Sequence, residues 1–166
     1  MSELRVGIGV DAHALSEDAR LVLAGVEFAG EPGLVGHSDG DVLSHALVDA
    51  ILGAAGMGDI GELFPSGDER WAGATSLRFL DHAIAVVREA GWELVNADCV
   101  LVGERPRIAP RREEMRRSLA DALGVSADRI TVRATTTDGL GFAGRGEGLA
   151  AHAVALLERP SGTVRS

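Results

Sequence analysis

Hydrophobic and polar positions along this chain follow two different periods. Near the N-terminus, Val6, Ile8 and Val10 alternate with Gly7 and Gly9, which is the two-residue period of a strand. Further along, leucine, isoleucine and alanine recur every three or four residues, which is the period of a helix with one buried face. The chain is therefore expected to combine strands with helices.

Helices are predicted where the longer period is bounded by terminal signals. Gly91 and Gly124 follow the second and third such segments, and glycine commonly follows a helix end. Pro110 stands at the start of the third segment, where a helix needs no N–H donor. The predicted helices are 41–55, 76–90 and 110–123, and the predicted strands are 6–10, 21–28, 94–102, 130–136 and 149–157.

These strands and helices interleave without strict alternation, which favours an α/β (α+β) fold. We expect a mixed four-stranded sheet covered by helices on one face. Neither a linker nor an internal repeat interrupts residues 1–158, which we expect to form a single domain. Residues 159–166 are expected to form a flexible C-terminal tail.

Composition narrows the possible functions. Of the 166 residues, 46% are hydrophobic but only 4% are aromatic, and 22 are glycine, so the core must consist of small and aliphatic side chains. A net charge of −9 argues against a nucleic-acid-binding surface. The single cysteine, Cys99, excludes an internal disulfide and suits a reducing compartment. No stretch has the length and apolarity of a membrane span. We expect a cytoplasmic protein that binds neither nucleic acid nor membrane.

Two clusters of carboxylate and imidazole groups offer ligands for a divalent cation. Asp11 and His13 are two residues apart at the end of the predicted strand 6–10, and in an extended chain they point to the same face. Asp41, His45 and Asp49 are spaced by four residues on a predicted helix. An Asp, His and His set with an open fourth position suits zinc or a related transition metal. The alternatives are a turn feature at the strand end and a solvated helix face.

An anion pocket is predicted beside these ligands. His37 and Ser38 directly precede the helix at 41–55. Backbone N–H groups at a helix N-terminus, together with a hydroxyl and an imidazole, can bind an anion. Capping of the helix by Ser38 is a compatible role.

A second polar segment follows the strand at 130–136. Threonine hydroxyls at 135–137 precede Asp138 and a glycine-rich turn, which suits a phosphate and a harder cation such as Mg²⁺. Strand propensity alone also explains the threonines. Arg145 lies among glycines, where it can bind a phosphate or pair with Glu147. Metal ligands together with phosphate-binding turns indicate phosphoryl chemistry.

The motifs occur at 9–13, at 37–41 through 58–65, at 134–137 and at 144–148. In this order and spacing they resemble the 2-C-methyl-D-erythritol 2,4-cyclodiphosphate synthase family over residues 5–157. The resemblance implies a homotrimer whose active sites lie between neighbouring subunits. It implies conversion of 4-diphosphocytidyl-2-C-methyl-D-erythritol 2-phosphate to the cyclic diphosphate and CMP, a step of non-mevalonate isoprenoid precursor synthesis.

The same resemblance assigns roles to residues. It implies zinc, or another divalent transition metal, at Asp11, His13 and His45, and Mg²⁺ or Mn²⁺ at Asp138 on the substrate diphosphate. It implies that His37 and Thr136 stabilise the transition state. Implied contacts with the methylerythritol and diphosphate groups are Ala12, Ser38, Asp59, Ile60, Gly61, Phe64, Pro65, Ser66, Gly67, Asp68, Phe142 and Arg145. Implied contacts with the cytidine are Gly103, Arg107, Ile108, Ala109, Ala134, Thr135 and Thr136.

The sequence departs from the family pattern at a few of these positions. Asp138 stands where many members carry Glu, and Ala72, Arg107, Gly139 and Ala143 replace residues that are frequent there. None of these changes removes a predicted zinc ligand. They are instead expected to change the affinity for the substrate. They are also expected to change the ligand of a central cavity, which in some members binds an isoprenoid diphosphate. The residues leave two alternatives open, a metal-dependent phosphohydrolase and a non-catalytic trimer that binds diphosphates.

Overall fold

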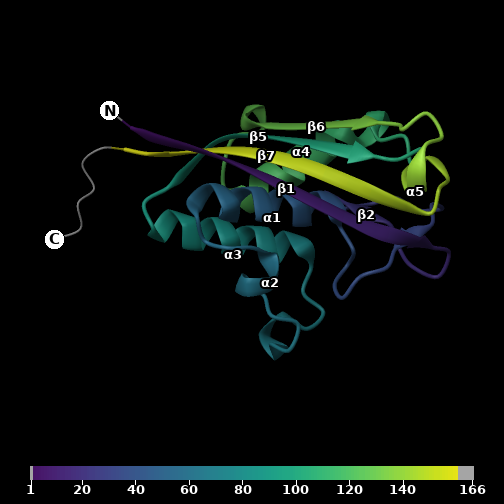
Figure 1. Cartoon of the computed structure of the whole chain (residues 1–166), viewed down its shortest axis with the longest axis horizontal. Coiled ribbons are helices and arrows are strands. Elements are labelled where there is room, and N and C mark those ends of the chain that lie inside the picture. The colour runs from purple at the N-terminus through teal and green to yellow at the C-terminus, as the bar shows by residue number, and fades with distance from the viewer. Residues whose placement is uncertain (1, 161–166) are drawn as a thin grey trace.

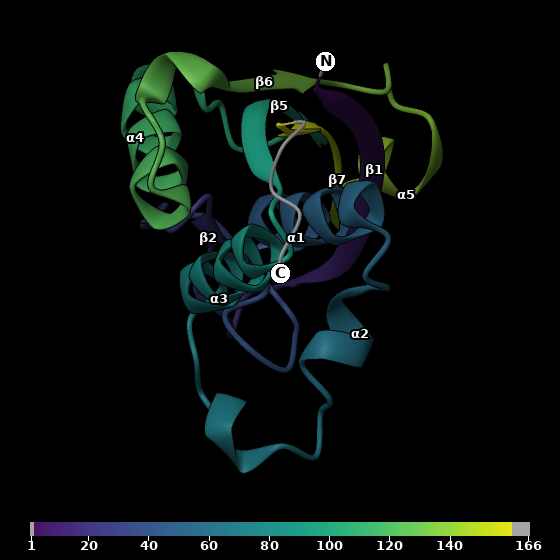
Figure 2. The same cartoon turned by 90° about the vertical axis from the view of Figure 1, so that its left-hand side faces the viewer.

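A mixed five-stranded sheet carries the main helices on one of its faces (Figures 1 and 2). The computed structural model describes residues 2–160. The strand order is β4-β1-β7-β5-β6, in which only β5 and β6 run parallel. These strands are β1 (Glu3–Ser16), β4 (Gly33–Leu34), β5 (Glu93–Val102), β6 (Ile130–Thr135) and β7 (Gly148–Arg159). The mixed α+β prediction is therefore confirmed.

The helices connect these strands and flank the site. The α-helices are α1 (Val42–Ala55), α2 (Ile60–Leu63), α3 (Ser76–Glu89), α4 (Arg112–Leu123) and α5 (Gly141–Gly144). Three 3₁₀ turns are η1 (Glu69–Trp71), η2 (Ala109–Arg111) and η3 (Ala127–Arg129). Figure 2 shows α1, α3 and α4 together on the concave side of the sheet.

Two details of the strand prediction were wrong. The sheet has a fifth strand, because β4 pairs with Leu15 and Ser16 at the end of β1. The predicted strand at 21–28 is instead a small separate hairpin of β2 (Val22–Leu23) and β3 (Val26–Glu27). Ala24 and Gly25 turn this hairpin with positive φ angles of 51° and 73°. Both features depend on long-range contacts that a two-residue period does not contain.

The hairpin turn is fixed by the residue that begins α1. Asp41 is fully buried and caps α1 by accepting from the Ser44 N–H at 3.1 Å. Its carboxylate also accepts from the N–H groups of Ala24 and Gly25 at 2.9 and 2.8 Å. Complete burial raises the pKa of Asp41, and these hydrogen bonds oppose the rise. Asp41 thus has a structural role and does not join the cluster of Asp11, His13 and His45 described below.

The alternating glycines of β1 explain how close α1 lies to the sheet. A Cβ at Gly7 would lie 2.0 Å from the Ala50 carbonyl oxygen, and one at Gly9 would lie 1.8 Å from the Ala46 carbonyl oxygen. Only glycine fits at both positions, because any side chain there would overlap the α1 backbone. The facing strands contribute small buried residues, including Ala153 and Cys99. The predicted small-residue core therefore lies between α1 and the sheet.

The opposite face of β1 is apolar and open. Leu4, Val6, Ile8 and Val10 are 59%, 70%, 66% and 54% exposed, and Val154 on β7 is 43% exposed. No helix of residues 2–160 has the length and apolarity needed to cross a membrane. Strand β7 ends at Arg159, and residues 161–166 of the predicted flexible tail lie outside the described residues.

Candidate metal centre and substrate pocket

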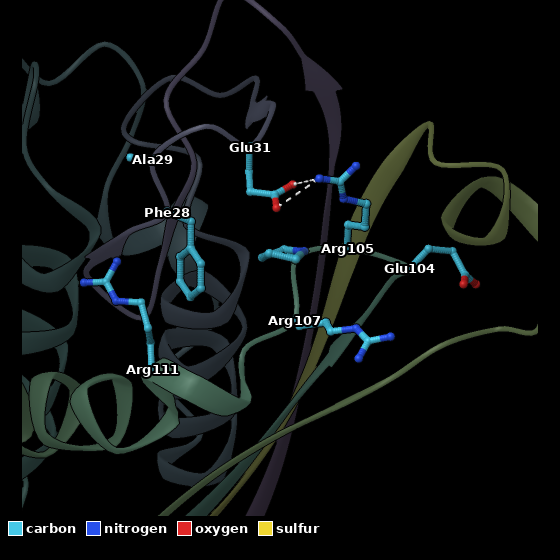
Figure 3. Close-up of a pocket in the computed structure, with 8 residues that line it drawn as sticks. Phe28, Ala29, Glu31, Glu104, Arg105, Arg107 and Arg111 are labelled. Atoms are coloured by element: carbon cyan, nitrogen blue, oxygen red, sulfur yellow. Dashed lines mark hydrogen bonds and ion pairs between the residues drawn. The ribbon is translucent and has the colours of Figure 1, made fainter.

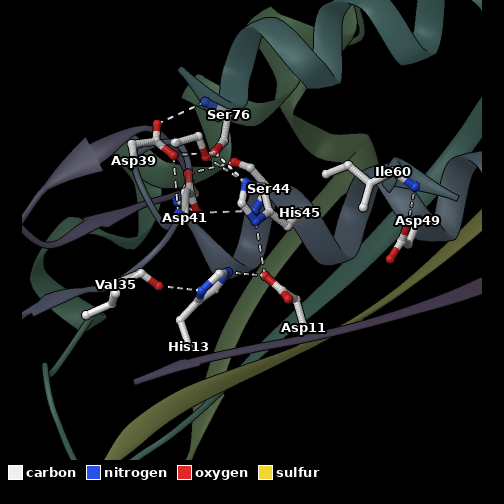
Figure 4. Close-up of polar contacts among 12 residues, drawn as sticks. Asp11, His13, Val35, Asp39, Asp41, Ser44, His45, Asp49, Ile60 and Ser76 are labelled. Atoms are coloured by element: carbon white, nitrogen blue, oxygen red, sulfur yellow. Dashed lines mark hydrogen bonds and ion pairs between the residues drawn. The ribbon is translucent and has the colours of Figure 1, made fainter. Parts of the chain in front are cut away.

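Three side chains from two elements converge at one point (Figure 4). Asp11 and His13 come from β1, and His45 comes from the first turns of α1. One ligand atom from each residue lies within 4.8 Å of the others. Oδ2 of Asp11 lies 2.9 Å from His13 Nε2 and 3.1 Å from His45 Nδ1. The alternating period of β1 places Asp11 and His13 on the same face as Gly7 and Gly9, toward α1.

A hydrogen-bond acceptor on the outer side of His13 determines which ring nitrogen faces the centre of the cluster. His13 Nδ1 lies 2.6 Å from the Val35 carbonyl oxygen, which can only accept, so Nδ1 carries the proton. Nε2 of His13 then presents a lone pair, and this buried atom has no hydrogen-bond partner within residues 2–160. With Oδ2 of Asp11 it forms a pair of acceptors that face each other. Such a group is satisfied by a cation, and the residues therefore fit a divalent metal ion.

The charges of the cluster shift the pKa values of its members. Burial works to raise the pKa of Asp11, but the adjacent imidazoles of His13 and His45, which donate to the carboxylate when they are protonated, outweigh burial and hold the pKa well below its usual range. The Asp11 carboxylate, which accepts from the protonated imidazole, raises the pKa of His13; burial opposes the rise and the Val35 carbonyl adds to it. A proton and a metal ion therefore compete for the same acceptors.

A pocket of about 470 Å³ opens beside the cluster. Of the residues that the sequence assigned to substrate, the lining includes His37, Ser38, Ile60, Gly61, Phe64, Pro65, Ser66 and Asp68. The other assigned residues on nearby segments do not line it. Ala12 points to the opposite face of β1 from the two ligands that flank it. Asp59 caps α2 by accepting from the Glu62 N–H at 2.9 Å. Gly67 is exposed on the loop after α2.

Sequence reasoning missed the aromatic wall of this pocket. Trp71 and Phe79 line it together with Phe64. The ring centroids of Phe64 and Trp71 are 4.7 Å apart, and those of Phe64 and Phe79 are 4.6 Å apart. The concentration of a rare residue class within 64–79 was the available signal, in a chain with only 4% aromatic residues. The pocket is thus lined both by the ligand candidates and by aromatic rings, and the centroid of the Phe79 ring lies 6.2 Å from that of His45.

A second cleft, of about 750 Å³, lies beside the segment after β5 (Figure 3). Arg107 lines it, whereas Ile108 is buried beneath it and Gly103 and Ala109 are not among its lining residues. Arg105 pairs with Glu31 at 3.2 Å across the cleft. The cleft is therefore bordered by arginines, and of these only Arg107 is among the residues assigned to the cytidine.

The segment after β6 does not line the metal pocket of the same chain. Ala134 and Thr135 end β6, and Thr136 and Asp138 follow on an exposed turn, where their side-chain oxygens lie 3.4 Å apart. Glu104 approaches this turn, 3.5 Å from the Gly139 N–H. The described residues therefore divide the predicted site into two groups, the metal pocket and the segments after β5 and β6.

Two further predicted residues lie on and beside α5. Arg145 forms an ion pair with Glu147 at 2.6 Å. This is one of the two roles that the sequence suggested for Arg145, the other being a phosphate contact. Phe142 is 42% exposed. Neither residue lines the metal pocket of its own chain. The Arg145 guanidinium is more than half exposed, so it remains accessible to a ligand.

Comparison with known proteins gives consistent results. The profile of the YgbB family matches residues 4–158. The chain is 56% identical to 2-C-methyl-D-erythritol 2,4-cyclodiphosphate synthase of Rubrobacter xylanophilus, over 98% of this chain and 100% of the relative. It is also 56% identical to the bifunctional enzyme IspD/IspF of an Anaeromyxobacter species, over 93% of this chain, and spans 40% of the length of that relative.

A solved structure supports the same relationship. The CDP-bound form of a 2C-methyl-D-erythritol-2,4-cyclodiphosphate synthase superimposes with a TM-score of 0.85 at 40% identity. The match covers 92% of this chain and 99% of that structure.

Proposed function

The chain belongs to the YgbB family, and on that premise we propose that it is a 2-C-methyl-D-erythritol 2,4-cyclodiphosphate synthase. The proposed substrate is 4-diphosphocytidyl-2-C-methyl-D-erythritol 2-phosphate. An oxygen of the 2-phosphate attacks the β-phosphorus, and the bond from the β-phosphorus to the bridging oxygen of the α-phosphate breaks. The products are the cyclic diphosphate and CMP, and no water is consumed. The step belongs to non-mevalonate isoprenoid precursor synthesis.

The observation that carries this proposal is the set of acceptors at Asp11, His13 and His45, which line a pocket together with aromatic and polar side chains. We propose zinc, or another divalent transition metal, as the cation at these residues. When bound there, such an ion supplies positive charge that polarises phosphate oxygens and offsets their mutual repulsion. The substrate carries two phosphorylated ends, so this repulsion is the main obstacle to bringing the ends together.

The protein's own residues supply positioning. Phosphoryl transfer asks mainly for in-line alignment and electrostatic stabilisation. The aromatic wall of Phe64, Trp71 and Phe79 excludes water from one side of the pocket, which strengthens charge interactions inside it. His37 and Ser38, which also line the pocket, are proposed to donate to the phosphate oxygens. The attacking phosphate oxygen is already an anion, so the chemistry requires no general base.

The nucleotide half of the site is proposed to come from a neighbouring subunit. Thr136, Asp138 and Arg107 do not line the metal pocket of their own chain, which supports a composite site. The row of exposed aliphatic residues on β1 supports a homotrimer, because a patch of this kind on a sheet face marks an interaction surface. In that assembly Asp138 would hold Mg²⁺ or Mn²⁺, and the ion would supply positive charge that neutralises the substrate diphosphate.

Three finer assignments complete the proposal. The remaining assigned residues keep their roles, with Ala12, Asp59 and Gly67 around the methylerythritol and Phe142 and Arg145 near the diphosphate. The exposed Phe142 and Arg145 are suited to an isoprenoid diphosphate in a central cavity of the trimer. The buried, unpaired Cys99 is compatible with a cytoplasmic location.

A product assay tests the proposal. Purified protein is incubated with the cytidylyl diphosphate substrate and Mg²⁺, with and without a strong chelator, and the products are analysed by mass spectrometry. We expect equal amounts of CMP and cyclic diphosphate, both lost on chelation. A linear phosphate product would indicate a phosphohydrolase instead. Binding without release of CMP by folded, metal-loaded protein would refute the catalytic assignment.

A further inference from the structure

The second imidazole nitrogen of His45 faces a buried hydroxyl that is paired with a half-buried carboxylate, and the proposed reaction uses neither (Figure 4). His45 Nε2 lies 2.8 Å from Oγ of Ser76, the first residue of α3. Ser76 Oγ donates in turn to Oδ1 of Asp39. Ser76 is fully buried, whereas Asp39 and His45 are half-buried, so the hydroxyl that joins them is shielded from water.

We propose that Ser76 and Asp39 are positioning residues that fix the tautomer of His45 so that its Nδ1 can bind the metal ion. This inference rests on the metal site of the proposed function and adds two residues to it. The pair lies 37 positions apart in the sequence. Neither residue belongs to the ligand set of Asp11, His13 and His45.

The direction of each hydrogen bond follows from the carboxylate. Asp39, when ionised, can only accept, so the Ser76 hydroxyl proton must point toward it. The hydroxyl oxygen then offers its lone pairs to His45, and Nε2 of His45 must carry the ring proton. Nδ1 is left as a lone pair, 3.1 Å from Oδ2 of Asp11. His45 thereby takes the state that a metal ligand needs, with the proton on the outer nitrogen.

Asp39 is itself held in place by backbone groups. Its Oδ2 accepts from the Ser76 N–H at 2.9 Å, and its Oδ1 accepts from the Asp41 N–H at 3.2 Å. The carboxylate therefore joins the N-terminus of α3 to that of α1. The His45 ring is oriented by two elements at once, which limits its rotation.

Ser38 is the competing partner for His45. Its hydroxyl lies 3.2 Å from His45 Nε2, farther than that of Ser76, and 3.4 Å from Ser76 Oγ. A hydroxyl can donate or accept, and within residues 2–160 no carboxylate is hydrogen-bonded to the Ser38 hydroxyl. Ser38 alone would permit either tautomer of His45. The Asp39 carboxylate fixes the orientation of the Ser76 hydroxyl proton, and the Ser38 hydroxyl has no such partner within residues 2–160.

The decisive variant is Asp39→Asn, which keeps the size of the side chain. The Ser76 N–H keeps the amide oxygen at the Oδ2 position, because the contact with the Asp41 N–H is the longer of the two. The amide NH₂ then donates to Ser76 Oγ, whose proton turns toward His45 Nε2. The His45 proton moves to Nδ1, where it blocks the metal. Ser76→Ala removes the oriented hydroxyl and leaves His45 with Ser38.

The control is Thr75→Ala. Thr75 is the exposed residue before α3 and makes no side-chain capping hydrogen bond, so this change removes a hydroxyl next to Ser76 without touching the pair. Zinc affinity is measured by competition with a chromophoric chelator. We expect Asp39→Asn and Ser76→Ala to lose about 10- to 100-fold in affinity, the range seen when such supporting hydrogen bonds are removed. Thr75→Ala should match the wild type.

The tautomer itself is read from ¹H–¹⁵N spectra of histidine-labelled, metal-free protein, with His45→Gln used to assign the His45 signals. At about pH 8.5, two units above the ordinary histidine pKa, we expect protonated Nε2 in the wild type and protonated Nδ1 in Asp39→Asn. A wild-type spectrum with protonated Nδ1 would overturn the inference even if no variant folded. So would wild-type zinc affinity in both variants. Failure of the wild type to bind zinc would instead overturn the metal site, and the inference with it.

Discussion

The close approach of α1 to β1 allows a test of whether the packing at Gly9 sets the position of His45, because a single added methyl group disturbs this packing. In Gly9→Ala the new Cβ would lie 1.8 Å from the Ala46 carbonyl oxygen and 2.8 Å from the Ala50 nitrogen. Ordinary contact begins at 3.4 Å, so the two backbones must separate by 1.6 Å, the difference between 3.4 and 1.8. Both partners are backbone, and no flexible side chain can absorb the shift.

This displacement acts on the metal centre directly. His45 precedes Ala46 on α1, and Asp11 follows Gly9 by two residues on β1. Metal–ligand distances tolerate about 0.2 Å, so a separation on the order of an ångström removes His45 from the ligand set. We also expect the free energy of unfolding of the metal-free protein to fall by about 1–3 kcal/mol, as overpacking does.

Denaturant unfolding with and without zinc measures both effects, at one fixed protein concentration. Zinc at 100 times the dissociation constant stabilises the wild type by about 2.7 kcal/mol. If Gly9→Ala weakens binding 100-fold, the same zinc concentration adds only about 0.4 kcal/mol. Gly9→Ala with the full wild-type stabilisation by zinc would refute the argument that this glycine sets the position of His45.

Gly53→Ala is the matched control on the same helix. A Cβ at Gly53 meets only the Ile8 carbonyl oxygen, at 4.0 Å. The substitution should therefore raise the free energy of unfolding by about 0.5–1 kcal/mol, because alanine is the better helix former. Stabilisation by zinc should be unchanged.

Four further predictions concern separate parts of the molecule. His45→Ala should abolish turnover and zinc binding together, measured by product assay and metal analysis; full activity without detectable zinc would contradict the metal assignment. Asp138→Asn should raise the Mg²⁺ concentration needed for turnover and leave zinc content intact, and equal loss of both metals would count against two sites. Burial raises the pKa of Cys99 to about 12, so thiol reagents at pH 8 should modify it only on unfolding; rapid modification of folded protein would show that the core opens. Ile8→Asp, on the exposed face of β1, should dissociate the proposed trimer in light scattering while far-ultraviolet circular dichroism stays unchanged, and an intact trimer would place the interface elsewhere.

Periodicity located most of the secondary structure, because strand and helix periods are properties of the backbone. The helix predicted at 41–55 is α1 at Val42–Ala55, and the strand predicted at 94–102 is β5 at Glu93–Val102. The first strand was predicted too short, because β1 continues through polar residues to Ser16. Pairing with β7 from Glu3 to Ala14 keeps the polar residues of β1 in the sheet. A local sequence pattern cannot reveal a partner strand that lies so far away in the sequence.

The sequence by itself determined which residue types can bind a cation and that Asp11 and His13 share a face of one strand. Tertiary structure alone decided that His45 meets them, since this depends on the helix backbone packing against Gly7 and Gly9. It also decided that Ser76 lies against His45, 31 residues away in sequence. The strand and helix periods follow from the backbone geometry of neighbouring residues. Contacts between residues far apart in the sequence depend instead on how helices and strands pack in the core. The side chains that orient a ligand are therefore the part of the site that sequence patterns leave out.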